Sequence, residues 1–360
     1  MLFAIILILS VASCSRIDSK TLVRDESVLP ESSDSSENSS ELSSSEAPPV
    51  DPDIINPLTG LYNYNKDIKI KRPIAIMISN SDLALPQCGI ENADVIFETL
   101  AEGGISRLMG IYSDVDKIPD IGPIRSARQY YVSIARGFDA VFMHWGGSVY
   151  ANDNLRLGGI SNVDANQYEG TYYWRDPDRR KNNGYEHSGF TNGEKIKEAI
   201  SGLNFDTTPK EKYYETFKFN PPDSPVIPSG GTCKQLLVPY SQYSDGVFDY
   251  DETTKLYKKT QNGIPQIDGT TKKQAEVTNL LVLFAPVKSM PSSSYIDVDL
   301  TGGSGIYVSN GSYEEITWEK GDMNNPFKFK AKNGDDLVIN AGRSWINIFP
   351  LDKKGSVVTK

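Results

Sequence analysis

The chain has 360 residues, a formal net charge of −10 at pH 7, three cysteines and two histidines. This length suits about two folded domains. The sequence shows no basic patch and no nucleic-acid motif, so nucleic acid is not expected as a partner. Two histidines without HxH or HxxxH spacing are a weak zinc signal, so we expect neither a metal nor another cofactor.

The N-terminus has the pattern of an exported, lipid-anchored protein. Residues 2–11 form an apolar run that is too short to cross a bilayer but has the length of a secretory-signal core. The tetrapeptide VASC, which ends at Cys14, is typical of a bacterial lipoprotein cleavage site. We expect residues 1–13 to be removed and the Cys14 sulfur to carry diacylglycerol, which anchors the protein at the outer face of the cytoplasmic membrane. The alternative is a buried N-terminal helix.

A polar segment, residues 14–55, follows the signal. From Glu31 to Ala47 it reads ESSDSSENSSELSSSEA, which has almost nothing to bury, so we expect a disordered tether. Residues 15–55 hold ten acidic and three basic side chains, a net charge of −7, which leaves about −3 for the folded part. The acidity therefore belongs to the tether and favours no particular ligand.

Residues 56–203 alternate strand and helix patterns and predict an N-terminal α/β domain with a mixed sheet. Pro123 predicts the start of a helix that ends near Gly137, because a missing N–H costs nothing in the first helical turn. Ser148 is expected to cap a second helix, which stops at Gly158-Gly159. Buried strands are expected at residues 73–78, 94–100, 105–112 and 139–145.

Residues 204–231 are rich in proline and predict an irregular interdomain connection. Residues 232–352 predict a C-terminal mainly-β domain, so the fold class is α+β overall. The runs 247–250 and 255–258 flank a short polar turn, as in a β-hairpin, and only residues 272–277 indicate a short helix. Further strands are expected at residues 280–285, 295–300, 305–308, 315–318, 327–330 and 344–349.

Two cysteines remain after lipidation. As an exported pair, Cys88 and Cys233 could form one disulfide, but nothing in their spacing requires it. Two separate, half-buried thiols are the simpler expectation. A catalytic cysteine is less expected still, because no histidine lies near either one in the sequence.

Several short motifs follow one another over nearly all of the chain after Asn56. They are RPIAIM (72–77), ADVIFE (93–98), EGGISR (102–107), IGPIRSAR (121–128), HWGGS (144–148), YWRD (173–176), the segment around His187, and GRSWI (342–346). Together they resemble the YerB-like lipoproteins of Gram-positive bacteria. The resemblance implies two adjacent domains of unknown function behind a lipoprotein signal, without an established reaction. Cys88 stands where this family usually has serine, which weakens the disulfide expectation further, and Ser188 follows His187 where asparagine is usual.

Two arginines point to an anion site. Arg125 and Arg128 are expected in the first turn of their helix, where cations oppose the macrodipole by about 0.3–1 kcal/mol each when exposed. An anion should therefore compensate them. Glu98 or Glu102 would do so in structural ion pairs, whereas a ligand carboxylate or phosphate would be held in a bidentate way. Structural pairs are somewhat more common, and both interpretations stay open.

A second set of candidates surrounds His144. It ends a predicted strand and is followed by a glycine-rich turn into a helix, where ligands of α/β sheets bind and free N–H groups favour anions. Aromatic side chains that suit sugar rings crowd the same half of the chain. The candidate ligand-binding residues are Arg125, Arg128, His144, Gly146, Gly147, Ser148 and His187, and the candidate acidic partners are Glu98, Glu102 and Asp176.

We therefore expect a lipid-anchored protein that binds an envelope-derived anionic or glycan ligand, or an envelope partner protein. The alternative is an enzyme acting on envelope glycan or peptide, with His144, His187 and either Glu98 or Asp176 as acid–base residues. Hydrogen-bond reach within one open cleft would favour the enzyme, and scattered, buried histidines the binder. A non-catalytic scaffold would show no cleft and would carry an exposed apolar patch.

Overall fold

The computed structural model describes residues 55–360, except residues 63, 66, 211–215 and 292. The signal, Cys14 and the tether up to residue 54 lie outside the described residues, so the expectations for them stay predictions. No helix in the described part is long and apolar enough to cross a membrane. All described residues belong to one compact unit.

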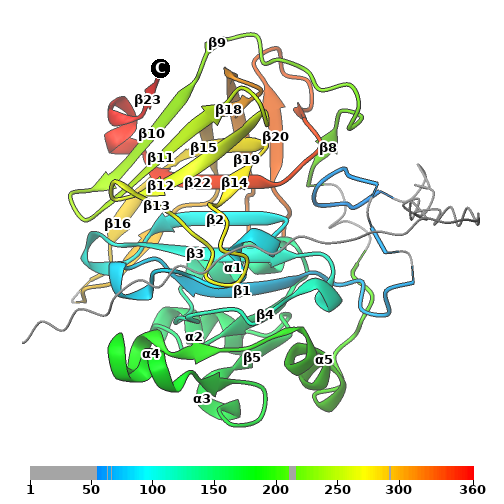
Figure 1. Ribbon diagram of the computed structural model, residues 1–360, viewed down its shortest axis with the longest axis vertical. Coiled ribbons are helices and arrows are strands. Elements are labelled where there is room, and N and C mark those ends of the chain that lie inside the picture. Colours follow the sequence, from blue (N-terminus) through cyan, green and yellow to red (C-terminus); the bar gives the residue numbers. More distant parts are fainter. Residues whose placement is uncertain (1–54, 63, 66, 211–215, 292) are drawn as a thin grey trace, which may run out of the picture. The chain divides into compact units, whose positions relative to one another are not determined.

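A large mixed sheet forms the centre of the molecule (Figure 1). Its strands are β1 (Ile74–Ser79), β2 (Val95–Leu100), β3 (Ser106–Tyr112), β4 (Val141–His144), β5 (Asn162–Asp164), β9 (Gly231–Thr232), β15 (Asn279–Ala285), β18 (Gly302–Ser309), β19 (Ser312–Glu319), β20 (Lys328–Ala331) and β22 (Ser344–Pro350). Their order is β20-β19-β18-β15-β22-β2-β3-β1-β4-β5, and β9 pairs with β19. The pairs β1–β4, β4–β5, β2–β22 and β15–β22 are parallel.

Strands from both halves of the chain share this sheet. Strand β22 lies between β2 and β15 and runs parallel to both, so that Ile346 pairs with Phe97 on one side and Leu281 on the other. All of β22 is buried, as a continuous apolar run predicts for a strand covered on both faces. The predicted fold class, α+β with a mixed sheet and a mainly-β C-terminal half, is confirmed. Where each domain begins and ends stays a prediction.

A second sheet packs against the main one. Its strands are β10 (Gln235–Ser241), β11 (Ser244–Asp251), β12 (Leu256–Gln261), β13 (Ile264–Pro265), β14 (Glu276–Val277) and β23 (Val358–Thr359). The predicted hairpin is confirmed, since β11 and β12 are antiparallel. The ring of Phe248 lies edge-on to Trp345 of β22, with centroids 5.7 Å apart. Three small pairs complete the strands: β6 (Trp174–Arg175) with β7 (Gly189–Phe190), β8 (Lys218–Phe219) with β21 (Val338–Ile339), and β16 (Val287–Ser289) with β17 (Ile296–Val298).

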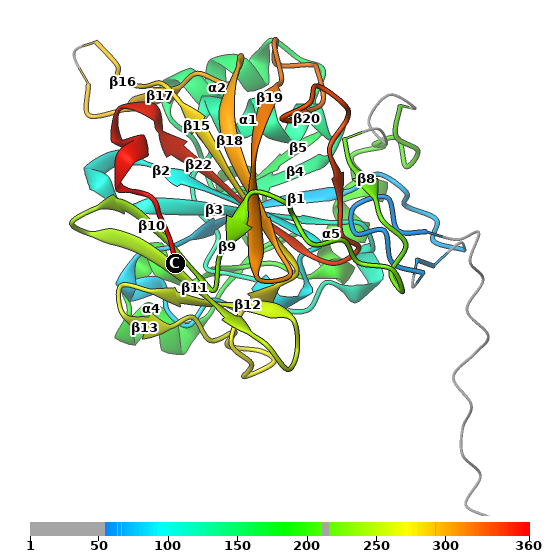
Figure 2. The same ribbon diagram turned by 90° about the horizontal axis from the view of Figure 1, so that it is seen from above.

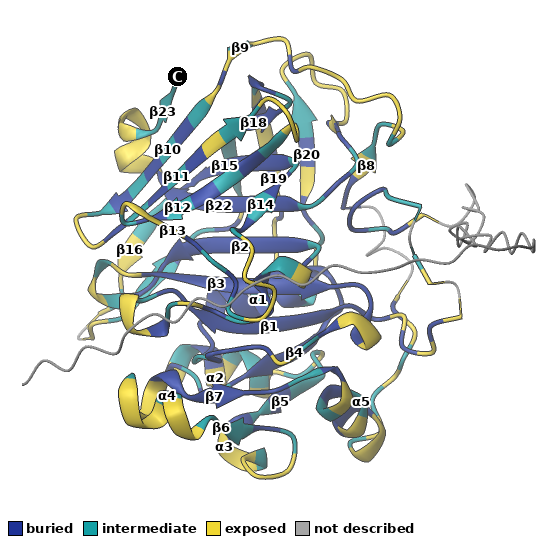
Figure 3. Ribbon diagram, in the orientation of Figure 1, coloured by how far each residue is buried: buried dark blue, intermediate teal, exposed yellow. Residues whose placement is uncertain are grey.

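The helices are α1 (Gln129–Gly137), α2 (Val149–Arg156), α3 (Ala165–Tyr168), α4 (Pro177–Asn182) and α5 (Gly193–Gly202). Figure 2 shows α1 and α2 on one side of the main sheet and β11 and β12 on the other. Alternate residues of β1 face opposite sides of the main sheet. Met77 belongs to the hydrophobic cluster that contains residues of α1, and Ile76 and Ile78 belong to the cluster that contains residues of the second sheet. Figure 3 shows the central strands buried and the outer turns of α4 exposed.

Helix α1 begins later than predicted. It starts at Gln129, and its N-cap, Arg128, has extended backbone angles (φ −128°, ψ 153°). The preceding residues pair with neighbouring strands instead of coiling: the amide of Ile124 donates to Gly189, and that of Arg125 donates to Met77. Tertiary pairing thus outweighs the helix-start preference of Pro123. The placement of Arg125 and Arg128 in a first helical turn was wrong, and the macrodipole argument does not apply to them.

The helix expected at residues 272–277 was also wrong. Lys272 has a left-handed backbone (φ 61°), and the last two residues form β14 beside β12. The amide of Ala275 donates to Gln266, so this segment is held as part of the second sheet. A helix there would leave the edge of β12 without the backbone pairing that β14 provides.

Candidate functional site

A cavity of about 350 Å³ lies where β4 leads into α2. We call it the arginine cavity, because the guanidinium groups of Arg125 and Arg175 both line it. They come from the segment before α1 and from β6. The other lining residues are Ile124, Ser126, Trp145, Gly146, Gly147, Asn166, Tyr185 and Glu186.

Backbone pairing builds one wall of this cavity. The amide of Ala127 donates to the carbonyl of Gly146 at 2.9 Å, and the amide of Trp145 donates to Arg125 at 3.1 Å. Gly146 has φ +67°, and a Cβ there would lie 2.6 Å from Nδ2 of Asn166. Only glycine fits this position without displacing Asn166. The glycine turn read from the sequence therefore holds the strand end close to the segment that carries Arg125.

Arg125 is only partly paired. Its Nη1 donates to Oε2 of Glu186 at 2.7 Å, and the two side chains are 24% and 69% exposed. The hydrogen bond and charge of Arg125 hold the pKa of Glu186 below its usual range. A guanidinium has five N–H donors, so donors of Arg125 remain for a ligand.

Arg175 is held in a rigid position. Its guanidinium lies 3.6 Å from the ring centroid of Trp145 and 3.7 Å from that of Tyr185. Its Nη1 donates to the carbonyl of Tyr185 at 2.7 Å, and its Nε donates to Glu169 at 3.2 Å. The two rings and the two hydrogen bonds fix the plane of the guanidinium, which lowers the ordering cost of binding a planar anion.

A third guanidinium, Arg107, lies behind the cavity wall. It is buried, donates from Nη1 to the carbonyl of Ser126 at 2.6 Å, and forms no ion pair with any residue that the structure describes. Burial, followed by the charges of Arg128 and Arg125, lowers its pKa to about 10. Arg107 is therefore charged at neutral pH and adds a positive charge behind the wall of the cavity.

Arg128 belongs to a structural ion pair. Its Nε and Nη2 donate to the two carboxylate oxygens of Glu102, both at 2.6 Å, and its Nη1 donates to the carbonyl of Ala127 at 2.7 Å. Burial disfavours both charges, but their mutual hydrogen bonds and attraction outweigh it, lowering the pKa of Glu102 and raising that of Arg128. Of the two alternatives left open by the sequence, the structural pair describes Arg128, which does not line the arginine cavity.

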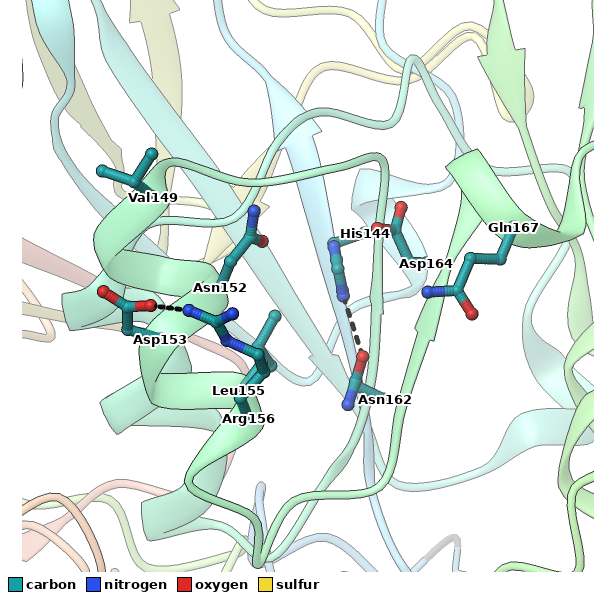
Figure 4. Close-up of a pocket in the computed structure, with 9 residues that line it drawn as sticks. All are labelled: His144, Val149, Asn152, Asp153, Leu155, Arg156, Asn162, Asp164 and Gln167. Carbon is teal, nitrogen blue, oxygen red and sulfur yellow. Dashed lines mark hydrogen bonds and ion pairs between the residues drawn. The ribbon is translucent and has the colours of Figure 1, made fainter.

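A second cavity, of about 590 Å³, lies beside the first between α2 and β5 (Figure 4). We call it the amide cavity. The imidazole of His144 points at Asn162, with Nε2 3.2 Å from Oδ1, and its Nδ1 lies 2.9 Å from the carbonyl oxygen of Gly146. The residues that line this cavity are His144, Val149, Asn152, Asp153, Leu155, Arg156, Asn162, Asp164 and Gln167.

Two of the sequence candidates are helix caps. The Oγ of Ser148 accepts a hydrogen bond from the amide of Ala151 at 3.1 Å, so the predicted cap of α2 is confirmed. Asp176 accepts from the amide of Arg179 at 2.7 Å and caps α4. Each of these side chains satisfies an otherwise free N–H in a first helical turn. Neither lines the arginine cavity or the amide cavity.

Two further candidates line neither cavity. Glu98 is fully buried between the two sheets, where Ser106, Asn80 and Trp345 donate to its carboxylate. His187 is buried, and its Nδ1 has no hydrogen-bond partner among the described residues. Burial, followed by the charge of Arg125, lowers the pKa of His187. The four groups proposed for acid–base catalysis therefore do not share one cavity.

The structure adds residues that the sequence reasoning did not single out. Arg175 and Asn166 line the arginine cavity, and Arg107 supports its wall. A signal existed for the two arginines, because Arg107 ends the EGGISR motif and Arg175 lies within YWRD. Their importance depends on which aromatic rings and carbonyl groups surround them, and that is set by the tertiary fold.

Metal and thiol chemistry receive no support from the described residues. Among them, no group of three or more His, Cys, Asp or Glu side chains could hold a metal ion. Cys88 and Cys233 are both free, which confirms two separate thiols; Cys88 is half-buried as expected, but the expectation was wrong for Cys233, which is buried. Burial raises the pKa of Cys233 to about 12, which keeps that thiol protonated at neutral pH.

Comparisons with known proteins define the class of this chain. The models of one family, described as protein of unknown function (DUF3048), match twice: the N-terminal domain over residues 58–206 and the C-terminal domain over residues 236–346. The chain therefore belongs to this two-domain family.

Individual relatives agree with that assignment. A Bacillus subtilis (strain 168) protein described as "Putative lipoprotein YerB" is 29% identical over 303 residues, which cover 82% of this chain and 86% of the relative. The crystal structure of the YerB protein from Bacillus subtilis matches with a TM-score of 0.71 at 26% identity, over 85% of this chain and 99% of that one. The resemblance inferred from the short motifs is confirmed.

Proposed function

We propose that this protein is a lipoprotein held at the outer face of the cytoplasmic membrane through Cys14, and that its folded part binds an anionic ligand of the cell envelope. The VASC tetrapeptide and the similarity to a protein described as a lipoprotein support the anchor. The arginine cavity supports the ligand class. The protein acts as a binder, because the histidines are buried and do not meet in one cleft.

The guanidinium groups at the arginine cavity carry the proposal for the ligand. Arg125 and Arg175 line the cavity, and the buried Arg107 adds positive charge behind it. Two of the opposing carboxylates, Glu186 and Glu169, are 69% and 40% exposed, so solvent screens their charges. A third, Asp164, accepts from the backbone amides of Gly146 and Asn166. A carboxylate or phosphate placed between the two guanidinium groups would accept several charge-assisted hydrogen bonds at once.

The test of the ligand class is binding of small anions to the folded protein. Isothermal titration with inorganic phosphate and with acetate should show binding that Arg125→Gln weakens by about 10- to 100-fold, the loss expected for one charge-assisted hydrogen bond. The matched control is Lys181→Gln, which removes an exposed cation of α4 that lines neither cavity. Equal affinity of wild type and Arg125→Gln, or no binding by the wild type, would reject an anion site here.

The anchor is tested independently. Since acylation requires a sulfur atom at the cleavage site, Cys14→Ala should move the protein from the membrane fraction into the medium or leave it as uncleaved precursor. Cell fractionation and labelling with a radioactive fatty acid report the result. Normal lipid labelling of the Cys14→Ala protein would contradict the anchor.

A further inference from the structure

The two cavities lie on either side of the same two segments. In the turn from β4 to α2, His144 and Val149 line the amide cavity, while the intervening Trp145, Gly146 and Gly147 line the arginine cavity. The segment from β5 into α3 divides in the same way: Asp164 and Gln167 line the amide cavity, and Asn166 lines the other. Consecutive Cα atoms are about 3.8 Å apart, so one ligand of a few linked units reaches both cavities.

The amide cavity has the opposite chemistry to the arginine cavity. Three side-chain amides, from Asn152, Asn162 and Gln167, line it, and each offers both donors and acceptors. Its one arginine, Arg156, is paired with Asp153 across one turn of α2 (Figure 4). It therefore holds no uncompensated positive charge for an anion. Groups that donate and accept at the same time, such as hydroxyls, match this lining.

The wall between the cavities is fixed from the amide side. The amide of Gly146 donates to Oδ1 of Asp164 at 2.7 Å, and its carbonyl lies 2.9 Å from Nδ1 of His144. Because a carbonyl only accepts, Nδ1 is the donor in the contact with Gly146, and the other ring nitrogen, Nε2, lies 3.2 Å from Oδ1 of Asn162. A wall held in this way needs little ordering when a ligand binds. His144 is thus a positioning residue for the peptide that separates the two cavities.

We propose that the ligand is an acidic carbohydrate, whose charged group lies in the arginine cavity and whose uncharged, hydroxyl-bearing sugar lies in the amide cavity. This inference rests on the proposed anion site and extends it to a second subsite. Asn152 and Gln167 are exposed, and their side-chain amides make no hydrogen bond to any residue that the structure describes. They are therefore free to bind hydroxyl groups. Trp145 follows His144 of the amide cavity in the sequence and itself lines the arginine cavity, so it adds an aromatic ring to the wall between the two subsites.

The experiment measures the binding of three kinds of probe to the protein. The first is a panel of tetrasaccharides that contain sugar acids, the second is the same panel with each carboxyl group reduced to an alcohol, and the third is inorganic phosphate. The acidic tetrasaccharides should bind more tightly than phosphate. The double variant Asn152→Ala/Gln167→Ala should weaken them by about 25-fold, at roughly fivefold for each hydrogen bond lost, and should leave phosphate binding unchanged. Asn182→Ala, which removes an exposed amide on α4, is the matched control.

The outcomes separate the two proposals. If phosphate does not bind, the anion site itself fails. If phosphate binds but no acidic tetrasaccharide binds more tightly, or if the double variant binds them as well as the wild type does, the anion site stands and the carbohydrate subsite is rejected. If the carboxyl-reduced tetrasaccharides bind weakly to the wild type and do not bind to the double variant, this result supports the amide cavity directly.

Discussion

Two of the ion pairs among the described residues differ in what surrounds them. Between the sheets, Glu98 and Lys259 are 0% and 1% exposed, with Nζ 3.5 Å from a carboxylate oxygen. At the arginine cavity, Arg125 and Glu186 are 24% and 69% exposed. The charged groups of the buried pair make their hydrogen bonds within the protein, whereas Arg125 of the open pair has N–H donors left for a ligand. Charge alone therefore does not identify a binding site; unused donors facing a cavity do.

The interior pair belongs to a network that joins the two sheets. Lys259 of β12 donates to Gln261 at 2.8 Å and lies over the rings of Phe248 and Trp345. Burial lowers the pKa of Lys259, and the charge of Glu98 opposes this effect. The carboxylate of Glu98 in turn accepts from Trp345 at 3.0 Å. Each charge is compensated, so removal of one partner should leave the other stranded.

The largest effect should follow from breaking the interior pair. Lys259→Met leaves Glu98 buried without its cation and should lower the free energy of unfolding by about 3–5 kcal/mol, measured by chemical denaturation. The double variant Glu98→Gln/Lys259→Met removes both charges and should recover much of that loss. A loss below about 1 kcal/mol in the single variant would show that water already reaches this pair.

A smaller loss is expected at Arg128. Arg128→Ala strands Glu102, whose side chain is 17% exposed and can be partly solvated, so the free energy of unfolding should fall by about 2–3 kcal/mol. Thermal melts without ligand measure this loss. Arg125→Gln serves as the comparison and should change stability by less than about 0.5 kcal/mol, because its partner is exposed. Equal losses in the two variants would remove the distinction between a structural and a binding arginine.

The smallest effect concerns Glu186, which competes with a ligand for Arg125. Glu186→Gln removes the carboxylate that now accepts from Arg125, and phosphate should bind about two- to fivefold more tightly, as the energy of an exposed ion pair predicts. Titration at low ionic strength gives the clearest measurement. Asp178→Asn, an exposed acid in the first turn of α4, controls for the change in net charge. Weaker binding in Glu186→Gln would mean that Glu186 is itself part of the site.

Much of the fold follows from the sequence, because hydrophobic runs and turn residues act locally. The strand run 73–78 and the hairpin around Tyr250 and Tyr257 are as predicted. The start of α1 was not, because hydrogen bonds to β1 and β7 hold Ile124 and Arg125 extended. No local pattern reveals such pairing. The same limit explains the short helix expected at 272–277, where β12 takes up the segment.

The candidate site was predictable only in part. The glycine turn and Arg125 were expected near a ligand, and the structure places them at one cavity, although their role stays a proposal. Arg125 and Arg128 could not be told apart in sequence, since only the fold brings Glu102 to the second of them. Glu98 was considered as a partner of the arginines and as a site acid, but its side chain is buried against Lys259 of the second sheet, which lies far away in the sequence.

The place of β22 has a consequence for how the chain completes its fold. This strand comes near the C-terminus, yet it fills the gap between β2 and β15, and its Trp345 bonds to Glu98, 247 residues earlier. Until it arrives, β2 presents an unpaired edge that could associate with other chains. Such distant contacts slow folding, since a long loop must close before they form. The main sheet is therefore complete only after the last strands of the chain have joined it.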